Sequence, residues 1–177
     1  YTRIYIQDPI HSEIMIKAYD NLGRATNSGI EITLDQKITK VWKISASANA
    51  YFNTIFPKSG TIDFPQPQAY SIPKRTDTPV FAKLTSQVSL PGEMILEMTG
   101  QFFSRKNIGQ GRELARGGID LGVKKSMAGS KLEFNLSATD IFNTMGIRQE
   151  IDGHGFYTEY QNFYETQVFT ISARYKF

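Results

Sequence analysis

Apolar and polar residues alternate along most of this 177-residue chain. In the stretch GIEITLD (29–35), isoleucine and leucine at every second position are separated by Glu, Thr and Asp. The same period recurs in WKISASANAYF (42–52) and LEFNLSATDIF (132–142). A period of two places successive side chains on opposite faces of a β-strand. Helical periodicity is nearly absent, so the sequence predicts an all-β, antiparallel protein.

The predicted strands are joined by connections that alternate between short and long. The alternating segments give about eight strands, at residues 1–7, 26–38, 40–56, 79–90, 93–104, 115–127, 131–143 and 163–177. Short turns fall near Thr39, at Pro91-Gly92 and at Gly129, and long loops at roughly 8–25, 57–76, 104–116 and 145–162. This order places all long loops at one end of the sheet. It is typical of a transmembrane β-barrel with short periplasmic turns and long extracellular loops.

A soluble sandwich or lipocalin-like barrel would also alternate, but the aromatic residues favour a membrane. They gather near both strand ends, where amphipathic rings sit at the level of lipid headgroups. Near the tight turns these are Trp42, Tyr175 and Phe177. Near the long loops they are Tyr51, Phe52, Phe56, Phe102, Phe103 and Phe142. We expect the membrane girdle to include Trp42, Phe52, Phe102 and Phe142.

Composition narrows the functional classes. The formal charge is only +3 without a dense basic run, so nucleic acid is not an expected partner. There is no cysteine for a disulfide or a thiolate metal site. No apolar run approaches the ~18 residues of a membrane helix, although barrel strands carry a weaker hydropathy signal. The chain starts at YTRIYIQ without an initiator Met or signal peptide, so we expect a fragment or a processed chain.

No catalytic constellation is visible, and we expect neither an enzyme nor a metal or cofactor site. His11 and His154 both fall in predicted loops. The Gly-rich stretch GQGRE (109–113) opens no helix, so a flexible loop tip is expected there instead of a phosphate site. Three mid-strand carboxylates are expected to line a hydrated barrel interior: Glu97, Asp120 and Glu133.

Candidate ligand contacts lie in the long loops. Basic residues gather at Arg105, Lys106, Arg112 and Arg116, with only Glu113 opposed to them in the sequence. A cationic mouth would attract anionic ligands such as ferric siderophores. The alternatives are acidic lipopolysaccharide headgroups or plain solubility. The loop aromatics Tyr157 and Tyr160, with Phe163 beside them, could stack on sugars or belong to hairpins that extend beyond the membrane.

Four stretches carry a resemblance to a known family. They are NLGRATNSGIEITLD (21–35), ARGGIDLGVKKSMAGSKLEFNLSATDIFNT (115–144) with its D-[IL]-F-N motif, GHGFYTEY (153–160) and FTISARYKF (169–177). Together they resemble the C-terminal part of a TonB-dependent receptor of the type common in Bacteroidetes outer membranes. The resemblance covers nearly the whole chain. It implies a 22-stranded barrel with an N-terminal plug domain, which this chain lacks.

The terminal strand also resembles the signal that the outer-membrane barrel assembly machinery recognises by pairing strand edges. Its apolar side would be Ile171, Ala173, Tyr175 and Phe177.

The expected function is therefore TonB-dependent transport of a siderophore, vitamin, glycan or peptide-like nutrient in the bacterial outer membrane. The chain, a single β-barrel segment over 1–177, would supply the C-terminal wall. Its expected partners are outer-membrane lipid, the rest of the barrel and plug, the assembly machinery, and the TonB complex through the absent N-terminal part. Alternatives are a complete small eight-strand structural barrel and a soluble β-barrel ligand binder. An isolated arc would leave two unpaired edges.

Overall fold

The computed structural model describes residues 2–21, 23–127, 129, 131–162 and 164–177. Their regular secondary structure consists of β-strands without a helix. Accordingly, these residues contain no helix of the length and apolar character that crossing a membrane requires. The all-β, antiparallel fold predicted from the alternation is confirmed.

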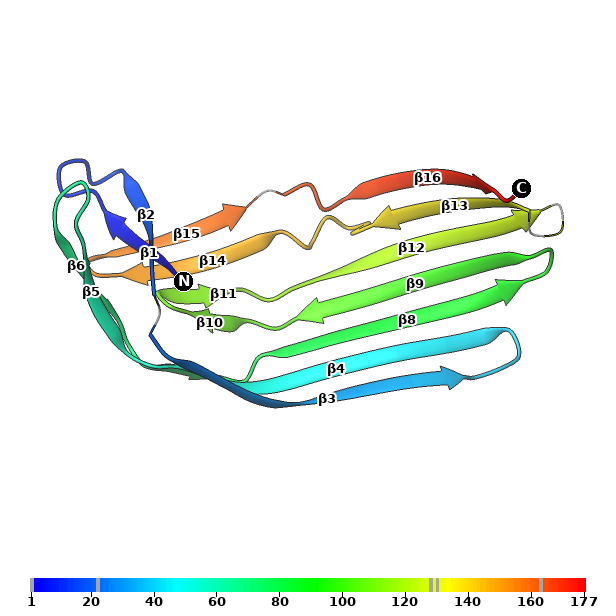
Figure 1. Ribbon diagram of the computed structural model, residues 1–177, viewed down its shortest axis with the longest axis horizontal. Coiled ribbons are helices and arrows are strands. Elements are labelled where there is room, and N and C mark those ends of the chain that lie inside the picture. Colours follow the sequence, from blue (N-terminus) through cyan, green and yellow to red (C-terminus); the bar gives the residue numbers. More distant parts are fainter. Residues whose placement is uncertain (1, 22, 128, 130, 163) are drawn as a thin grey trace.

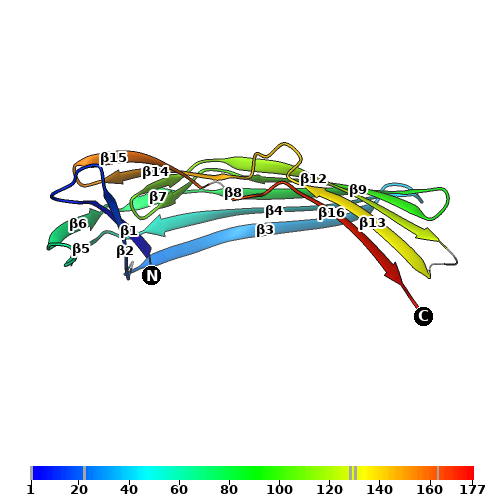
Figure 2. The same ribbon diagram turned by 90° about the horizontal axis from the view of Figure 1, so that it is seen from above.

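One long antiparallel sheet dominates the molecule (Figure 1). Its strand order is β16-β13-β12-β9-β8-β4-β3, with the short β7 (Arg75–Asp77) pairing with the end of β4. The long strands are β3 (Ala25–Lys37), β4 (Trp42–Ile55), β8 (Val80–Leu90), β9 (Met94–Phe103), β12 (Arg116–Met127), β13 (Leu132–Thr139) and β16 (Val168–Tyr175). Figure 2 shows this sheet as a single curved layer. It is open, and β3 and β16 form its two edges.

The predicted separation of short and long connections is confirmed. The turns β3–β4 and β8–β9 lie together at one end, as do the facing ends of β12 and β13 and the C-terminus (Figure 1). In the β8–β9 turn, Gly92 and Glu93 adopt positive φ values of 75° and 58°. The predicted turn at Gly129 falls between residues 128 and 130, which lie outside the described residues.

All four predicted long loops contain β-structure. They contain β2 (Met15–Asp20), β5 (Lys58–Ile62), β6 (Gln68–Ile72), β7, β10 (Lys106–Ile108), β11 (Gly111–Glu113), β14 (Ile147–Gly153) and β15 (Phe156–Asn162). Short hairpins carry fewer alternating residues than the long strands, so Pro, Gly and Asp outweighed their pattern. The proline-rich segment forms the separate β5–β6 pair, consistent with its exclusion from a central strand.

Three predicted strands also need correction. The first, β1 (Thr2–Gln7), pairs with β2 and does not join the long sheet. Strand β13 ends at Thr139, earlier than expected, because Asp140 and Asn143 adopt positive φ values of 45° and 53° that break the ladder. Strand β16 begins at Val168, five residues later than expected.

The packed core lies at the hairpin end of the molecule. The β1–β2 and β5–β6 hairpins and the end of β4 enclose a buried cluster of Ile4, Ile6, Ile55, Tyr70 and Ile72. Ile16 and Ile62 pack against it. By contrast, the long sheet leaves large apolar side chains exposed, with Ile171 at 79% and Ile30 at 72%. A single layer has no second layer on which to bury an apolar face.

Candidate functional site: a two-faced sheet and its hairpin end

One face of the long sheet is apolar across its width. Residues directly opposite each other in antiparallel strands share a face. One such row crosses six strands: Trp42, Val88, Leu96, Val123, Leu136 and Ile171. A second row contains Leu34, Ala46, Leu84, Gly100 and Ile119. A contiguous exposed apolar surface of this extent is suited to contact with lipid hydrocarbon.

The opposite face is polar along the same strands. One of its rows consists of Asp35, Ser45, Thr85, Thr99 and Asp120. Thr85 and Thr99 share a hydrogen bond of 2.9 Å between their hydroxyl oxygens. The three carboxylates expected to line a hydrated interior, Glu97, Asp120 and Glu133, all lie on this face. The Glu133 carboxylate forms ion pairs with Lys176 Nζ at 3.0 Å and Lys124 Nζ at 3.4 Å, which compensate its negative charge.

The four girdle candidates all lie on the apolar side. Trp42 is at the tight-turn end, where its indole Nε1 donates to Ser86 Oγ at 3.0 Å. Phe52 and Phe102 are near the hairpin end, 56% and 47% exposed. Phe142, beyond the end of β13, is 64% exposed. Membrane contact by these rings stays a prediction, and their positions at two levels of the apolar face are those the girdle requires.

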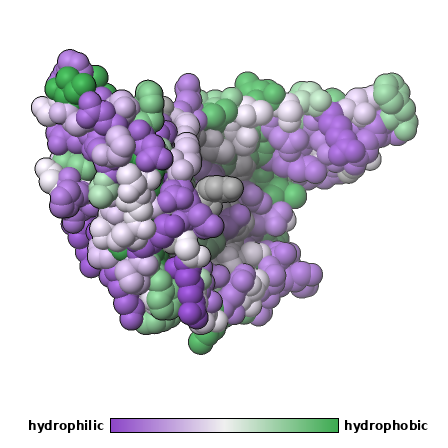
Figure 3. All heavy atoms as spheres, turned by 60° about the vertical axis from the view of Figure 1, so that its left-hand side comes forward, coloured by the Kyte–Doolittle hydropathy of each residue, from purple (hydrophilic) through white to green (hydrophobic). Residues whose placement is uncertain are grey.

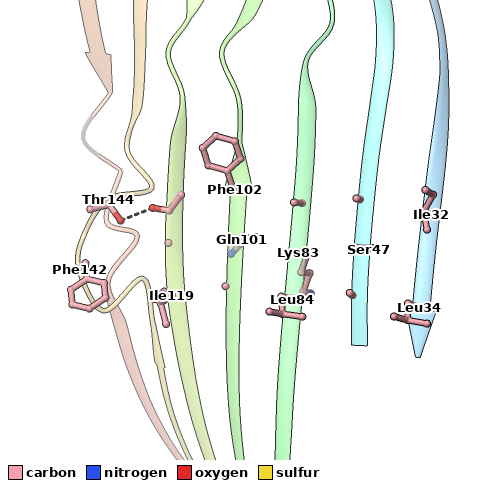
Figure 4. A pocket seen from close by; sticks show the side chains of 16 residues that line it. Ile32, Leu34, Ser47, Lys83, Leu84, Gln101, Phe102, Ile119, Phe142 and Thr144 are labelled. Carbon is pink, nitrogen blue, oxygen red and sulfur yellow. Dashed lines mark hydrogen bonds between the residues drawn. The ribbon is translucent and has the colours of Figure 1, made fainter. Parts of the chain in front are cut away.

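A shallow depression of about 780 Å³ occupies the apolar face. Figure 4 shows Phe102 and Phe142 beside it, with Leu34, Leu84 and Ile119 along its length. Thr144 closes one side by donating its hydroxyl to the carbonyl oxygen of Gly117 at 2.5 Å. Because most of its lining is apolar and continuous with the apolar rows, the depression is part of the apolar face.

Seen with the hairpin end forward, the surface is mostly hydrophilic (Figure 3). The basic cluster predicted there is more nearly neutral than the sequence suggested. Glu113 pairs with Arg116 and, at 3.6 Å, with Lys106. The expectation that Glu113 alone opposes the cluster is wrong, because β14 brings Glu150 onto Arg112. The hydrogen bond that the Arg112 guanidinium donates to the Glu150 carboxylate raises the pKa of Arg112 above its ordinary value.

Two adjoining clefts lie among these hairpins. The first, here called the hairpin cleft, has a volume of about 380 Å³. Its lining comprises Arg75, Asn107, Gly111, Arg112, Glu150, Asp152 and Tyr157. The second, of about 450 Å³, shares Asn107 and Arg112 with it and is also lined by Arg105.

The predicted ligand contacts are therefore only partly brought together. Arg112 and Tyr157 share the hairpin cleft, and Arg105 lines the cleft beside it. Lys106 and Arg116 instead converge on Glu113. Tyr160 lies opposite Gln149 in the β14–β15 hairpin, 37% exposed. Phe163 lies outside the described residues. Whether any of them contacts a ligand stays a prediction.

Other cleft residues were missed from the sequence: Arg75, Asn107, Glu150 and Asp152. A signal existed for β14, because Ile147, Gln149, Ile151 and Gly153 alternate with charged residues. No local pattern marks Arg75, which reaches the cleft because β7 pairs with the end of β4. Its guanidinium Nη2 lies 3.8 Å from Asp152 Oδ2.

The GQGRE stretch is structured, and its prediction as a flexible loop tip is wrong. Gly111 begins β11 and has a φ of 140°, and a Cβ there would lie 1.9 Å from the carbonyl oxygen of Glu150. Glycine is therefore required for β11 to approach β14. Gln110 is buried, with only 3% exposed. Among the residues described, no three His, Cys, Asp or Glu side chains gather as metal ligands do.

The assembly-signal residues lie at the open edge of the sheet. Ile171, Ala173 and Tyr175 belong to β16, which pairs only with β13 among the described strands. Phe177 follows the strand, and its ring lies 5.2 Å from that of Tyr175 in a T-shaped arrangement. An edge strand presents unpaired main-chain groups that suit strand addition. Recognition by an assembly machinery remains a prediction.

Comparison with known proteins adds one match. A family model described as the outer membrane protein beta-barrel family matches residues 1–175. No curated protein and no solved structure matches the chain.

Proposed function

Because this chain belongs to the outer membrane protein beta-barrel family, we propose that it forms the C-terminal barrel wall of a TonB-dependent transporter. The chain is a protein of the bacterial outer membrane. The observation that carries the proposal is the two-faced sheet, apolar on one side and hydrogen-bonding on the other. The apolar rows would contact outer-membrane lipid, and the polar rows would line a hydrated lumen.

The open edges support a larger wall over a small self-closed barrel. Closure of a small barrel would pair the first long strand with the last, yet β3 and β16 do not pair with each other among the described strands. In the proposed protein, the rest of the barrel would pair with these edges and a plug domain would contact the polar face. The TonB complex would act through parts beyond this chain, and the assembly machinery would recognise β16. The soluble ligand-binding alternative does not fit the outer-membrane family.

The proposed role of this chain is structural within transport and does not include catalysis. Ion pairs and cross-strand hydrogen bonds occupy the polar face, as in the Lys124–Glu133–Lys176 cluster. Such groups hydrate and shape a lumen. The transported compound would be a siderophore, vitamin, glycan or peptide-like nutrient.

The proposal is tested by nutrient uptake in strains that lack either this gene or the TonB protein. We expect both deletions to abolish uptake of the same nutrient, and the full-length gene to restore it only when TonB is present. Uptake that persists without TonB would contradict the transport mechanism. A gene deletion that weakens the membrane without changing uptake would instead identify a structural barrel.

A further inference from the structure

We infer that the hairpin cleft binds a neutral, hydroxyl-rich ligand, namely a saccharide. The inference rests on the proposed function in placing this cleft on the outer surface, and it specifies the ligand class there.

Hydrogen bonds and buried neighbours hold the residues of the cleft wall in place. Asp77 accepts a hydrogen bond from Asn53 Nδ2 at 2.9 Å and another from the main-chain N of Asn107 at 2.5 Å. The Asn107 side chain in turn donates to the carbonyl oxygen of Thr76 at 3.2 Å. On the opposite wall, Ile151 is fully buried between Glu150 and Asp152. These contacts fix the wall positions before a ligand arrives, which reduces the entropic cost of binding.

The charges in the cleft balance. Arg75 and Arg112 supply two positive charges, and Glu150 and Asp152 supply two negative ones. Arg112 is already paired with Glu150, and Arg75 lies 3.8 Å from Asp152. An anionic ligand would meet both carboxylates, and a cationic ligand would meet both guanidinium groups. The balance therefore favours an uncharged ligand.

Hydrogen-bonding capacity remains in the same residues. The buried Nε of Arg75 has no hydrogen-bond partner within the described part of the chain. The Asp152 side chain is 70% exposed and can accept hydrogen bonds. Neighbouring donors and acceptors of this kind match vicinal hydroxyl groups, each of which both donates and accepts. Buried donors without partners are costly, so a ligand that satisfies one gains affinity.

An aromatic ring completes the cleft. Tyr157 lies opposite Asp152 in the β14–β15 hairpin and is 61% exposed. An exposed tyrosine beside polar groups can cover the apolar C–H face of a sugar ring. The cleft volume of about 380 Å³ is at the lower end of the range for small-molecule sites, about 300–1,000 Å³. It therefore fits a short saccharide segment.

The test is a binding titration of the detergent-extracted full-length gene product. One arm uses neutral oligosaccharides in solution, and the other uses neutral polysaccharide released from lipopolysaccharide. Binding in either arm supports the site and identifies the source of the sugar. We expect Tyr157→Ala to weaken binding about tenfold. Tyr164→Ala is the matched control, because Tyr164 is equally exposed, at 60%, but does not line the cleft.

A second variant probes the hydrogen bonds. Arg75→Lys keeps the positive charge but removes the guanidinium, and we expect it to weaken saccharide binding severalfold while the cleft remains neutral. The inference is overturned if no saccharide binds the folded protein, if an anion such as citrate binds more tightly, or if Tyr164→Ala weakens binding as much as Tyr157→Ala. Because the titration requires no TonB, intact saccharide binding together with nutrient uptake that persists without TonB would refute the transport proposal alone. Intact uptake without saccharide binding would refute this inference alone.

Discussion

The side chain of Gln110 binds both main-chain polar groups of Tyr5, which lies 105 residues earlier in the chain. Tyr5 N donates to Gln110 Oε1 at 2.6 Å, and Gln110 Nε2 donates to Tyr5 O at 3.1 Å. The side-chain amide of Gln110 thus makes the two hydrogen bonds with Tyr5 that a residue of a neighbouring β-strand would make. It attaches the β1–β2 hairpin to the sheet that contains β11 and β14.

Replacing this amide should loosen the β1–β2 hairpin. Gln110→Ala leaves a buried N–H and a buried carbonyl of Tyr5 without partners, so we expect the local opening free energy to fall by about 2–4 kcal/mol. Amide hydrogen exchange at Tyr5 measures this directly. Gln149→Ala is the control, because Gln149 makes only a 3.5 Å side-chain contact with Glu113. Unchanged protection of the Tyr5 amide in Gln110→Ala would show that the contact does not hold the hairpin.

The hairpin core should respond to alkaline pH through Tyr70. Burial and the hydrogen bond to Asp20 raise the pKa of Tyr70 from 10.0 to about 12. A raised pKa means that this contribution to stability is complete below pH 10 and is lost as pH rises through about 12. We expect the ultraviolet titration of tyrosinate to contain a late step near pH 12 that is absent in Tyr70→Phe. A Tyr70→Phe curve identical to wild type would contradict the assignment.

The segment after β13 depends on Asp140. Its buried carboxylate accepts hydrogen bonds from Thr144 N and Met145 N, both at 2.9 Å, and from Thr166 Oγ1 at 2.5 Å. Asp140→Ala removes these contacts and a further one from Thr144 Oγ1 at 3.3 Å. We expect the free energy of unfolding, measured in urea, to fall by about 2–4 kcal/mol. Asp63→Ala, at an exposed position, should leave it within about 0.5 kcal/mol. Equal effects of the two substitutions would show that Asp140 does not hold this segment.

The long strands were predictable because their alternation is repeated. In β4, Ala46, Ala48 and Ala50 lie on the same face of the sheet. A pattern repeated over this length still predicts a strand when one position departs from it. The direction of the strands follows from the alternation of short turns, such as Pro91-Gly92, with long connections. The sequence alone shows no physical reason for the DIFN motif. The structure supplies one, because Asp140 closes the end of β13.

The hairpin end was less predictable because it depends on contacts between distant segments. Nothing near Arg75 in the sequence indicates that it meets Asp152, 77 residues later, or that Glu150 neutralises Arg112. The basic residues therefore form a cationic cluster only in sequence order, because the acidic partner of Arg112 comes from a distant strand. Likewise, the glycine at Gly111 suggested flexibility, whereas close strand approach requires it.

The central claim is that one face of the long sheet meets lipid and the other meets water. These 177 residues contain no cysteine, so single-cysteine spin labels can be placed at each position of β8 once any cysteine elsewhere in the full-length protein is replaced by serine. Power-saturation spectroscopy of the full-length protein in outer-membrane lipid would compare accessibility to oxygen with accessibility to a water-soluble nickel chelate. We predict oxygen maxima at Ala82, Leu84 and Val88 and minima at Lys83, Thr85 and Gln87, with the chelate preference in the opposite phase. Oxygen accessibility without a period of two along β8, or with its maxima on Lys83, Thr85 and Gln87, would contradict the account.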